Sequence, residues 1–164
     1  MLRESAHEWL RTPDMTDQEI FLDVVARCAS ELGSISDDWM LFGGAAMVLH
    51  GLSGPIVSDI DIVTSTGTAA QLAEKYALPD QSNSASKLFR SEVFVRPDFG
   101  PIPVEVMGGF EIYRDGLWVP VTAAQFQKVS ISGQMVNLAS RHRLKEIFEL
   151  CGREKDLTRA GRLG

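Results

Sequence analysis

The chain has 164 residues, of which 45% are hydrophobic and 23% charged, as in an ordinary folded domain with an apolar core. Its formal net charge of −6 argues against bulk, non-specific binding to nucleic acids, which depends on many contacts from Lys and Arg. The two cysteines, Cys28 and Cys151, predict neither a disulfide framework nor a zinc site and fit a reducing cytoplasm. No stretch approaches the roughly 18 apolar residues of a membrane span, so we expect one cytoplasmic domain over residues 1–164 and no membrane partner.

The first predicted element is an amphipathic helix over residues 16–33. Thr16 and Glu19 have the spacing of a capping box, apolar residues recur at helical intervals, and Gly33 supplies the stop. The next segment, "WMLFGG", predicts a short buried strand that enters a glycine turn. A short helix is expected to leave that turn and to end at Gly51.

A second strand is predicted at "SDIDIVTS", where β-branched residues alternate with polar ones. Residues 67–77 predict a helix, and residues 79–86 predict a turn-rich loop. Residues 87–95 and 101–107 predict two paired strands, joined by "RPDFG" as a hairpin turn.

The last third of the chain predicts short strands or turns around Gly116 and Gly133. A helix follows over residues 140–151, and "REKDLTRAGRL" predicts a final short helix. Helices and strands interleave along the whole chain. This order predicts an α/β or α+β fold, a mixed sheet flanked by helices, with its core over about 16–138 and C-terminal helices over about 140–163.

Two carboxylates, Asp59 and Asp61, interrupt the second predicted strand. Charge in or near a core is costly unless it is paired or bound to a metal. Because side chains alternate along a strand, both acids point to one face, with Cα atoms roughly 6–7 Å apart. Carboxylates placed in this way can share divalent cations, and oxygen-only ligands suit Mg²⁺ or Mn²⁺ better than Zn²⁺.

The glycine turn at Gly43 and Gly44 precedes these acids. A strand that ends in glycines before a helix points backbone N–H groups and the positive end of a helix dipole at one place. Glycine also lets a phosphate approach the backbone closely. If the two strands are neighbours, the turn and the carboxylates lie together. Such a combination is the machinery of phosphoryl or nucleotidyl transfer.

These four residues, Gly43, Gly44, Asp59 and Asp61, make the sequence resemble a known family. A glycine pair at a strand–helix turn, followed by "SDIDIV", is similar to the nucleotidyltransferase superfamily related to DNA polymerase β. The resemblance implies a nucleotidyltransferase-type mixed sheet. It also implies that the two glycines contact the β- and γ-phosphates of a nucleoside triphosphate (NTP).

The family further implies a third carboxylate on a later strand. Glu105 in "IPVEVMGG" is the best match, and Glu92 is its rival. By this resemblance, Asp59, Asp61 and Glu105 hold two Mg²⁺ ions, or Mn²⁺, that carry the NTP. Glu105 also helps to activate an acceptor hydroxyl, which attacks the α-phosphorus in line and releases pyrophosphate.

The minimal AbiEii-like nucleotidyltransferases are the most similar subgroup. The segment "LASRHRLKEIFELCGREKDL" resembles their C-terminal part, with Lys145, Arg153, Lys155 and Asp156 at matching places. The resemblance implies that Lys145 contacts a phosphate or the leaving group. In the alternative interpretation Lys145 serves solubility, and the other three residues form a surface salt-bridge cluster.

Three functions are therefore weighed. The first is transfer of a nucleoside monophosphate to a hydroxyl of a protein, an RNA or a small molecule, in a toxin–antitoxin or defence system with a partner protein from a neighbouring gene. The second is a binding module, an antitoxin or regulatory partner, that keeps the fold without catalysis. The segment "GPIVSD" favours this second function. Proteins of the family often have an Arg and then a Thr just before the Asp strand, and here Pro55 and Val57 stand in those places. The third is a structural domain whose acids lie on a solvated face.

Overall fold

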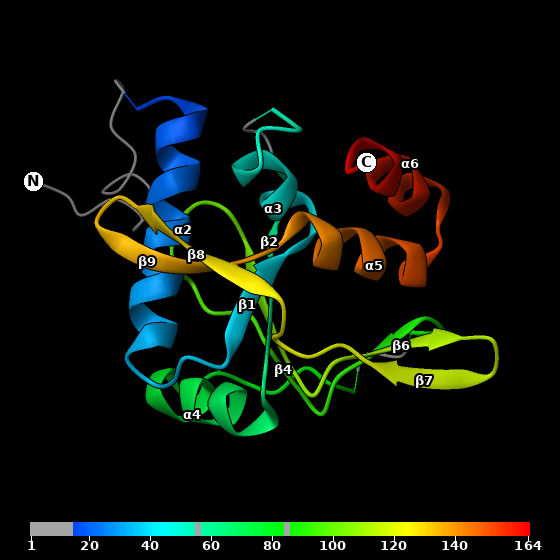
Figure 1. The fold of residues 1–164 in the computed structure, drawn as a ribbon. Helices are drawn as coiled ribbons and strands as arrows, with labels where there is room; N and C mark the ends of the chain where they lie inside the picture. The colour runs from blue at the N-terminus through cyan, green and yellow to red at the C-terminus, as the bar shows by residue number, and fades with distance from the viewer. Residues whose placement is uncertain (1–14, 55–56, 84–85) are drawn as a thin grey trace, which may run out of the picture.

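The computed structural model describes residues 15–54, 57–83 and 86–164. In these ranges five helices accompany a six-stranded mixed sheet of order β4-β5-β2-β1-β9-β8 and a three-stranded antiparallel sheet of order β3-β6-β7 (Figure 1). The elements are α2 (Asp17–Gly33), β1 (Trp39–Phe42), α3 (Gly43–Leu49), β2 (Ile60–Thr64), α4 (Thr66–Tyr76), β3 (Phe89–Arg90), β4 (Val93–Val95), β5 (Val104–Gly108), β6 (Glu111–Arg114), β7 (Leu117–Pro120), β8 (Phe126–Ile131), β9 (Gln134–Ala139), α5 (Arg141–Cys151) and α6 (Glu154–Arg162). The predicted mixed sheet flanked by helices is confirmed.

Helix α2 begins with the capping box that its sequence predicts. The Thr16 hydroxyl accepts a hydrogen bond from the Glu19 backbone N–H, and the Glu19 carboxylate accepts one from the Thr16 N–H, both at 3.1 Å. The two bonds satisfy backbone donors that the first helical turn leaves unpaired. The helix then buries one apolar stripe against β8 and β9, including Val24, Cys28 and Leu32.

The three central strands bring the predicted site residues into register. Strand β1 runs antiparallel to β2, with Phe42 opposite Asp61. Strand β2 runs parallel to β5, with Asp61 opposite Glu105. The expectation that the glycine turn and the Asp strand belong to neighbouring strands is therefore confirmed. Helix α4 covers β4 and β5, and α3 packs on β1 and β2.

The single strand predicted over residues 87–95 is wrong. The chain bends there, so that β3 pairs with β6 in the smaller sheet and β4 pairs with β5 in the larger one. The bend allows Phe89 to pack against Phe110, with ring centroids 5.7 Å apart, while Val95 stays fully buried in the larger sheet. The predicted pairing with the next strand holds for Val93–Val95 only, and residues 84–85 of the predicted loop lie outside the described residues.

The chain ends in two consecutive helices, as predicted. Ser140 caps α5, because its hydroxyl accepts a hydrogen bond from the Arg143 N–H at 3.1 Å. Helix α6 packs on α5, and the hairpin of β6 and β7 extends below α5 (Figure 1). Of the helices in the described part of the chain, none combines the length and the apolar character that crossing a membrane requires.

Candidate functional site

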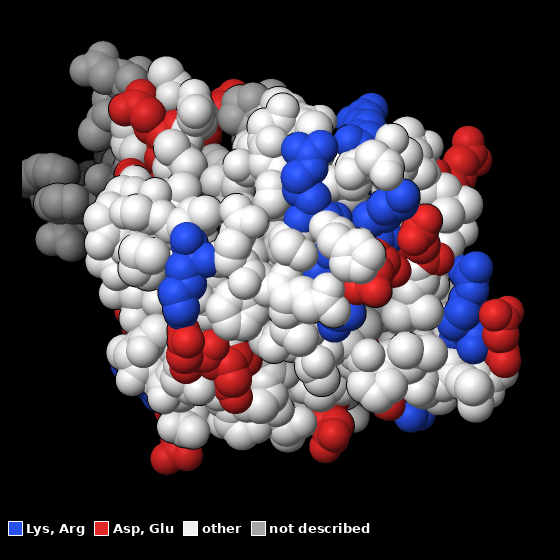
Figure 2. Space-filling view, in the orientation of Figure 1, with Lys and Arg blue, Asp and Glu red and all other residues white. Residues whose placement is uncertain are grey.

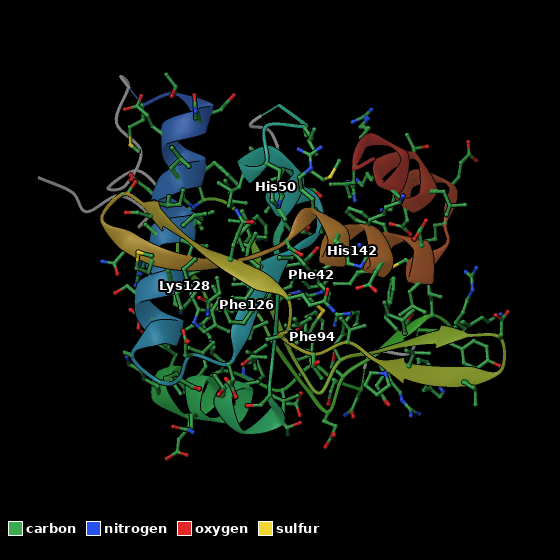
Figure 3. The ribbon with its side chains drawn as sticks, viewed as in Figure 1. Phe42, His50, Phe94, Phe126, Lys128 and His142 are labelled. Carbon is green, nitrogen blue, oxygen red and sulfur yellow. The ribbon has the colours of Figure 1, made fainter. Side chains whose placement is uncertain are left out.

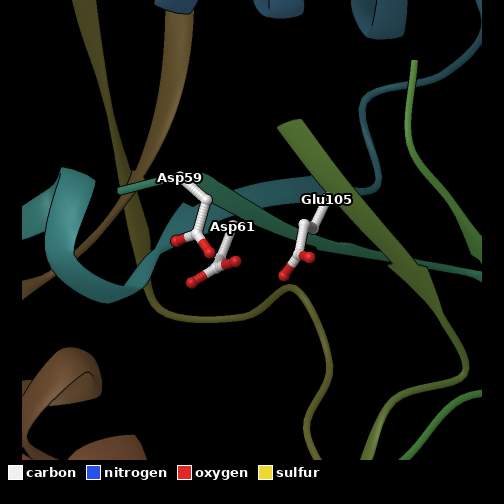
Figure 4. Close-up of side chains that lie close together, drawn as sticks. All are labelled: Asp59, Asp61 and Glu105. Atoms are coloured by element: carbon white, nitrogen blue, oxygen red, sulfur yellow. The ribbon is translucent and has the colours of Figure 1, made fainter. Parts of the chain in front are cut away.

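Three carboxylates converge at the centre of the larger sheet. Asp59 lies just before β2, Asp61 lies within it, and Glu105 lies opposite Asp61 on β5. One oxygen from each side chain can be chosen so that all three lie within 4.8 Å of one another, and Figure 4 shows the groups directed at a common point. This spacing fits a divalent cation bound by oxygen ligands alone, as Mg²⁺ or Mn²⁺ prefers.

The structure distinguishes Glu105 from its rival, Glu92. The Glu92 side chain lies against Gly109, where a Cβ atom would stand 3.0 Å from the Glu92 carboxylate oxygen. Glu92 belongs to the bend between β3 and β4 and is absent from the acidic cluster. The third carboxylate of the group is therefore Glu105, the residue that the sequence pattern favoured.

The acids crowd negative charge in a partly desolvated place. Burial is the main cause that raises the pKa of Asp61 well above its usual range, and the charges of Asp59 and Glu105 raise it further. Burial and the charge of Glu105 raise the pKa of Asp59, while nearby cations, first Lys155 and then Arg159, oppose the shift. A bound divalent cation would remove this repulsion, so the charge of the cluster as well as its geometry suits a metal.

Arg96 partly balances the cluster from the loop between β4 and β5. Its Nε and Nη2 atoms both donate to Glu105 Oε2, at 3.0 and 2.9 Å, and its Nη1 atom donates to Gln81. Its guanidinium also stacks over Phe94, 4.7 Å from the ring centroid. The sequence had suggested only a turn at "RPDFG". Nothing in that pattern indicates where the side chain of its first residue, Arg96, will reach.

The glycine turn touches the acids directly. Gly43 begins α3 with a φ of +69°, and a Cβ atom there would stand 2.9 Å from Asp61 Oδ2. A Cβ atom on Gly44 would stand 3.4 Å from an Nη atom of Arg159 on α6. Any larger residue at Gly43 would need a strained backbone and would displace Asp61. The turn therefore lies between a carboxylate on one side and an arginine on the other.

These groups line one cleft of about 610 Å³. Its apolar lining comes from both sheets and from α3 and α5, as Phe42, Met47, Phe89, Phe94, Met107, Phe110, Ile147 and Phe148. Its cations are Arg90, Arg96, Arg153, Lys155, Arg159 and Arg162. Figure 2 shows Lys and Arg side chains gathered on the side of the molecule where α6 lies. A cleft with an acidic centre, a basic wall and an apolar floor suits a ligand that is both phosphorylated and partly apolar.

The structure does not bring Lys145 into this cleft. Its ammonium group donates to the Gly164 carbonyl at 3.0 Å, and Lys145 is not among the lining residues. Lys155 lines the cleft instead, together with Arg159 and Arg162, which the sequence reasoning missed. A signal for them exists, because the three cations recur at i, i+4 and i+7 and therefore share one face of α6.

The described histidines lie apart from the acids. His50 follows α3, and its Nε2 atom is 2.8 Å from the Ala139 carbonyl oxygen, which ties the end of α3 to the end of β9. His142 lies on α5, 3.6 Å from Glu146 (Figure 3). Neither lines the cleft. In the described part of the chain, no imidazole is therefore available to the acids of the cleft.

Comparison with known proteins bears on the fold. No family model matches the sequence, and no curated protein matches it. A Thermotoga maritima protein of known structure, itself only proposed to be a nucleotidyltransferase, superposes with a TM-score of 0.59 at 22% identity, over 80% of this chain and 85% of that chain. The chain has a nucleotidyltransferase fold.

A second solved structure, an antigenic nucleotidyltransferase-like protein from Paracoccidioides brasiliensis, matches with a TM-score of 0.48 at 21% identity, over 88% of this chain and 74% of that chain. Within the nucleotidyltransferase fold of this chain, Asp59, Asp61 and Glu105 form an acidic triad with the spacing of a metal site. The fold and the triad are independent observations, because one comes from the backbone and the other from side-chain geometry.

Proposed function

We propose that the protein is a metal-dependent nucleotidyltransferase, which moves a nucleoside monophosphate from an NTP to a hydroxyl acceptor. The observation that carries this proposal is the acidic triad of Asp59, Asp61 and Glu105 beside the Gly43 turn, within a cleft that has a basic wall. A plain structural role for these acids does not account for their convergence, because three carboxylates brought together without a cation repel one another.

Each residue has a role in the proposed reaction. Asp59, Asp61 and Glu105 would hold Mg²⁺ or Mn²⁺. When bound, the ions neutralise phosphate charge and make an acceptor hydroxyl more acidic. The acceptor oxygen forms a bond to the α-phosphorus, the bond from that phosphorus to the β-phosphate oxygen breaks, and pyrophosphate leaves. The hydroxyl proton passes to Glu105, and Gly43 and Gly44 contact the departing phosphates.

We propose the AbiEii-like subgroup on the residues that the sequence shares with it. Arg153, Lys155 and Asp156 of that pattern line the cleft, which supports this placement, whereas Lys145 does not line it. The acceptor hydroxyl belongs to a protein, an RNA or a small molecule. A function beside a partner protein, in a toxin–antitoxin or defence pair, is proposed from the same resemblance.

Label transfer tests the proposed function. The purified protein is incubated with Mg²⁺ and each of the four α-labelled NTPs, alone and with RNA or cell extract. We expect label in an acceptor with the wild type, and a decrease of more than about 100-fold in the D59N/D61N double variant, since metal coordination contributes several kcal/mol to the transition state. Glu92→Gln is the matched control, because this acid lies outside the triad, and it should retain transfer.

Two results would contradict the proposal. One is the absence of any label transfer together with the absence of metal-dependent NTP binding. The other is a cellular phenotype that survives replacement of Asp59 and Asp61 by Asn. The second result would favour the binding module, in which the fold is kept and the acids are not catalytic.

A further inference from the structure

Arg159 on α6 faces the glycine turn with its hydrogen-bonding groups unused. One Nη atom lies 3.4 Å from the position that a Cβ atom of Gly44 would occupy. The guanidinium carbon is 5.6 Å from the centroid of the Phe148 ring, so the half-buried side chain rests on an apolar surface. Within the described residues, Arg159 makes no hydrogen bond and no ion pair, which leaves its five N–H donors available.

Among the described residues, Arg159 forms no close ion pair with the other charges of the cleft, although its charge acts on Asp59 and Asp61 from a distance. Three of the six lining cations already have carboxylate partners, in the pairs Arg90–Glu111 at 2.7 Å, Arg96–Glu105 at 2.9 Å and Arg153–Asp156 at 2.6 Å. The other three, Lys155, Arg159 and Arg162, share one face of α6 and have no ion pair in the described part of the chain. The cleft therefore has a row of unpaired cations in a protein whose net charge is −6.

The space beside Arg159 is shaped for an anion. Gly44 has no side chain, so an oxygen of a ligand can approach its backbone closely. The planar fork of a guanidinium group matches two oxygens of one phosphate and stays charged at all relevant pH values. The triad lies on the other side of the turn, where Asp61 contacts Gly43. A chain of phosphates that begins at the triad and follows the turn would reach Arg159.

We infer that Arg159 binds the terminal phosphates of the NTP and gives the cleft its preference for triphosphates over monophosphates. This inference rests on the proposed function and names a residue of the same site. Arg159 from α6 then supplies the positive charge that the loop "GPIVSD" lacks. It also stabilises the charge that develops on pyrophosphate when the bond to the α-phosphorus breaks. Lys155 and Arg162 extend the cationic face along the helix.

Calorimetric titration with inorganic tripolyphosphate tests the assignment without dependence on the base or on catalysis. The titrations use wild type, Arg159→Gln and Arg159→Lys, each with Mg²⁺. We expect Gln to weaken tripolyphosphate binding by roughly 10- to 100-fold, the loss typical of a hydrogen bond to a charged group. Lys should retain part of the affinity, and binding of nucleoside monophosphates should change little. Arg141→Gln is the control, since Arg141 is exposed and does not line the cleft.

The two hypotheses fail in different ways. Equal tripolyphosphate affinity in wild type and Arg159→Gln, with unchanged urea unfolding midpoints, overturns the role of Arg159 and leaves the transfer reaction standing. Loss of binding in Arg141→Gln to the same extent also overturns it, because the effect would then be general charge. Arg159-dependent tripolyphosphate binding in a protein that transfers no label supports the inference and favours the binding module over the proposed reaction.

Discussion

Gly43 has two roles at the site: it forms the turn after β1, and it leaves space for the Asp61 carboxylate. Its φ of +69° lies in the left-handed region that side chains with a Cβ atom disfavour. The same missing Cβ leaves room for Asp61, whose Oδ2 atom would be only 2.9 Å away. A single glycine therefore serves the turn and the position of a metal-binding carboxylate. Substitution should separate these two effects.

Gly43→Ala is predicted to lose Mn²⁺ binding by about 10- to 100-fold, the range found when the support of a metal ligand is disturbed. Gly51→Ala is the matched control, because Gly51 has a φ of +75° and nothing within 4 Å of the added Cβ. Both variants should lose about 1–2 kcal/mol of unfolding free energy from the left-handed backbone alone. Calorimetry and urea unfolding measure the two quantities. Unchanged Mn²⁺ affinity in Gly43→Ala would contradict the contact with Asp61.

Alternation along the strand predicted the shared face of Asp59 and Asp61, and the family resemblance added Glu105, whereas the positions of Arg96 and Arg159 beside the acids were not predicted. Alternation along a strand fixes the face of Asp59 and Asp61, and the same rule places Glu105 between two buried valines. These are local rules. Arg96 reaches Glu105 from a loop, and Arg159 reaches the glycine turn from a helix more than 100 residues later in the chain. Such contacts depend on tertiary packing, which no local pattern encodes.

At the scale of elements, α6 is positioned by one buried carboxylate. Asp156 is only 1% exposed, and its oxygens accept hydrogen bonds from the backbone N–H of Arg153 at 3.2 Å and from the Nε and Nη2 atoms of its side chain at 2.6 and 3.1 Å. The carboxylate closes the first turn of the helix. Because α6 also carries Lys155 and Arg159, the cap helps to align the cationic row with the cleft.

Asp156→Ala is predicted to lower the unfolding free energy by about 1–2 kcal/mol, as for removal of a helix cap. The cost stays moderate because the Arg153 side chain is 43% exposed and can be hydrated when its partner is removed. Faster hydrogen exchange in α6 should accompany the loss. Glu154→Ala, at an exposed position in the same turn, is the control. A variant with the exchange pattern of wild type would show that the cap does not hold α6.

The positions of helices and strands along the chain were predicted better than the direction of individual side chains and the pairing of strands. The capping box at Thr16 and the helix expected from residue 140 mark two helix starts, and both are confirmed. Lys145 belongs to the predicted helix, but helix packing turns its ammonium group to the Gly164 carbonyl and away from the cleft. The predicted strand over residues 87–95 divides between two sheets, because the burial of Phe89 beside Phe110 outweighs the continuity of the strand.

At the scale of the whole molecule, the net charge gives no indication of the site. The protein carries −6 overall, yet six cations and four acids line one cleft. These residues come from β2 and the residue before it, from β3, from the loop after β4, from β5, and from α6 with the residue that precedes it. Folding therefore gathers acidic and basic side chains in one cleft, which the net charge alone does not reveal. Because acids are crowded in this cleft, the free energy of unfolding should depend on pH and on bound metal.

The contribution of Asp59 and Asp61 to the stability of the metal-free protein should fall as pH rises through their raised pKa values. Burial, first, and neighbouring acids raise the pKa of Asp59 and Asp61, so the folded state holds protons that the unfolded chain releases. This contribution is complete below the ordinary aspartate pKa of about 3.9 and is lost at pH values above the raised ones. A divalent cation reverses the loss, because it binds the ionised carboxylates in the folded state alone.

Comparison with the D59N/D61N double variant isolates this effect, because other acids act in the opposite direction. Hydrogen bonds from Lys128 and Asn137, for example, lower the pKa of Asp37. In chelator, the unfolding free energy of wild type minus that of the double variant should decrease as pH is raised from about 4 towards neutrality. Mn²⁺ should raise the wild-type value at neutral pH and have little effect on the variant. A difference that stays constant with pH would show that the pKa values of Asp59 and Asp61 are not raised, and equal stabilisation of both proteins by Mn²⁺ would show that the triad is not the metal site.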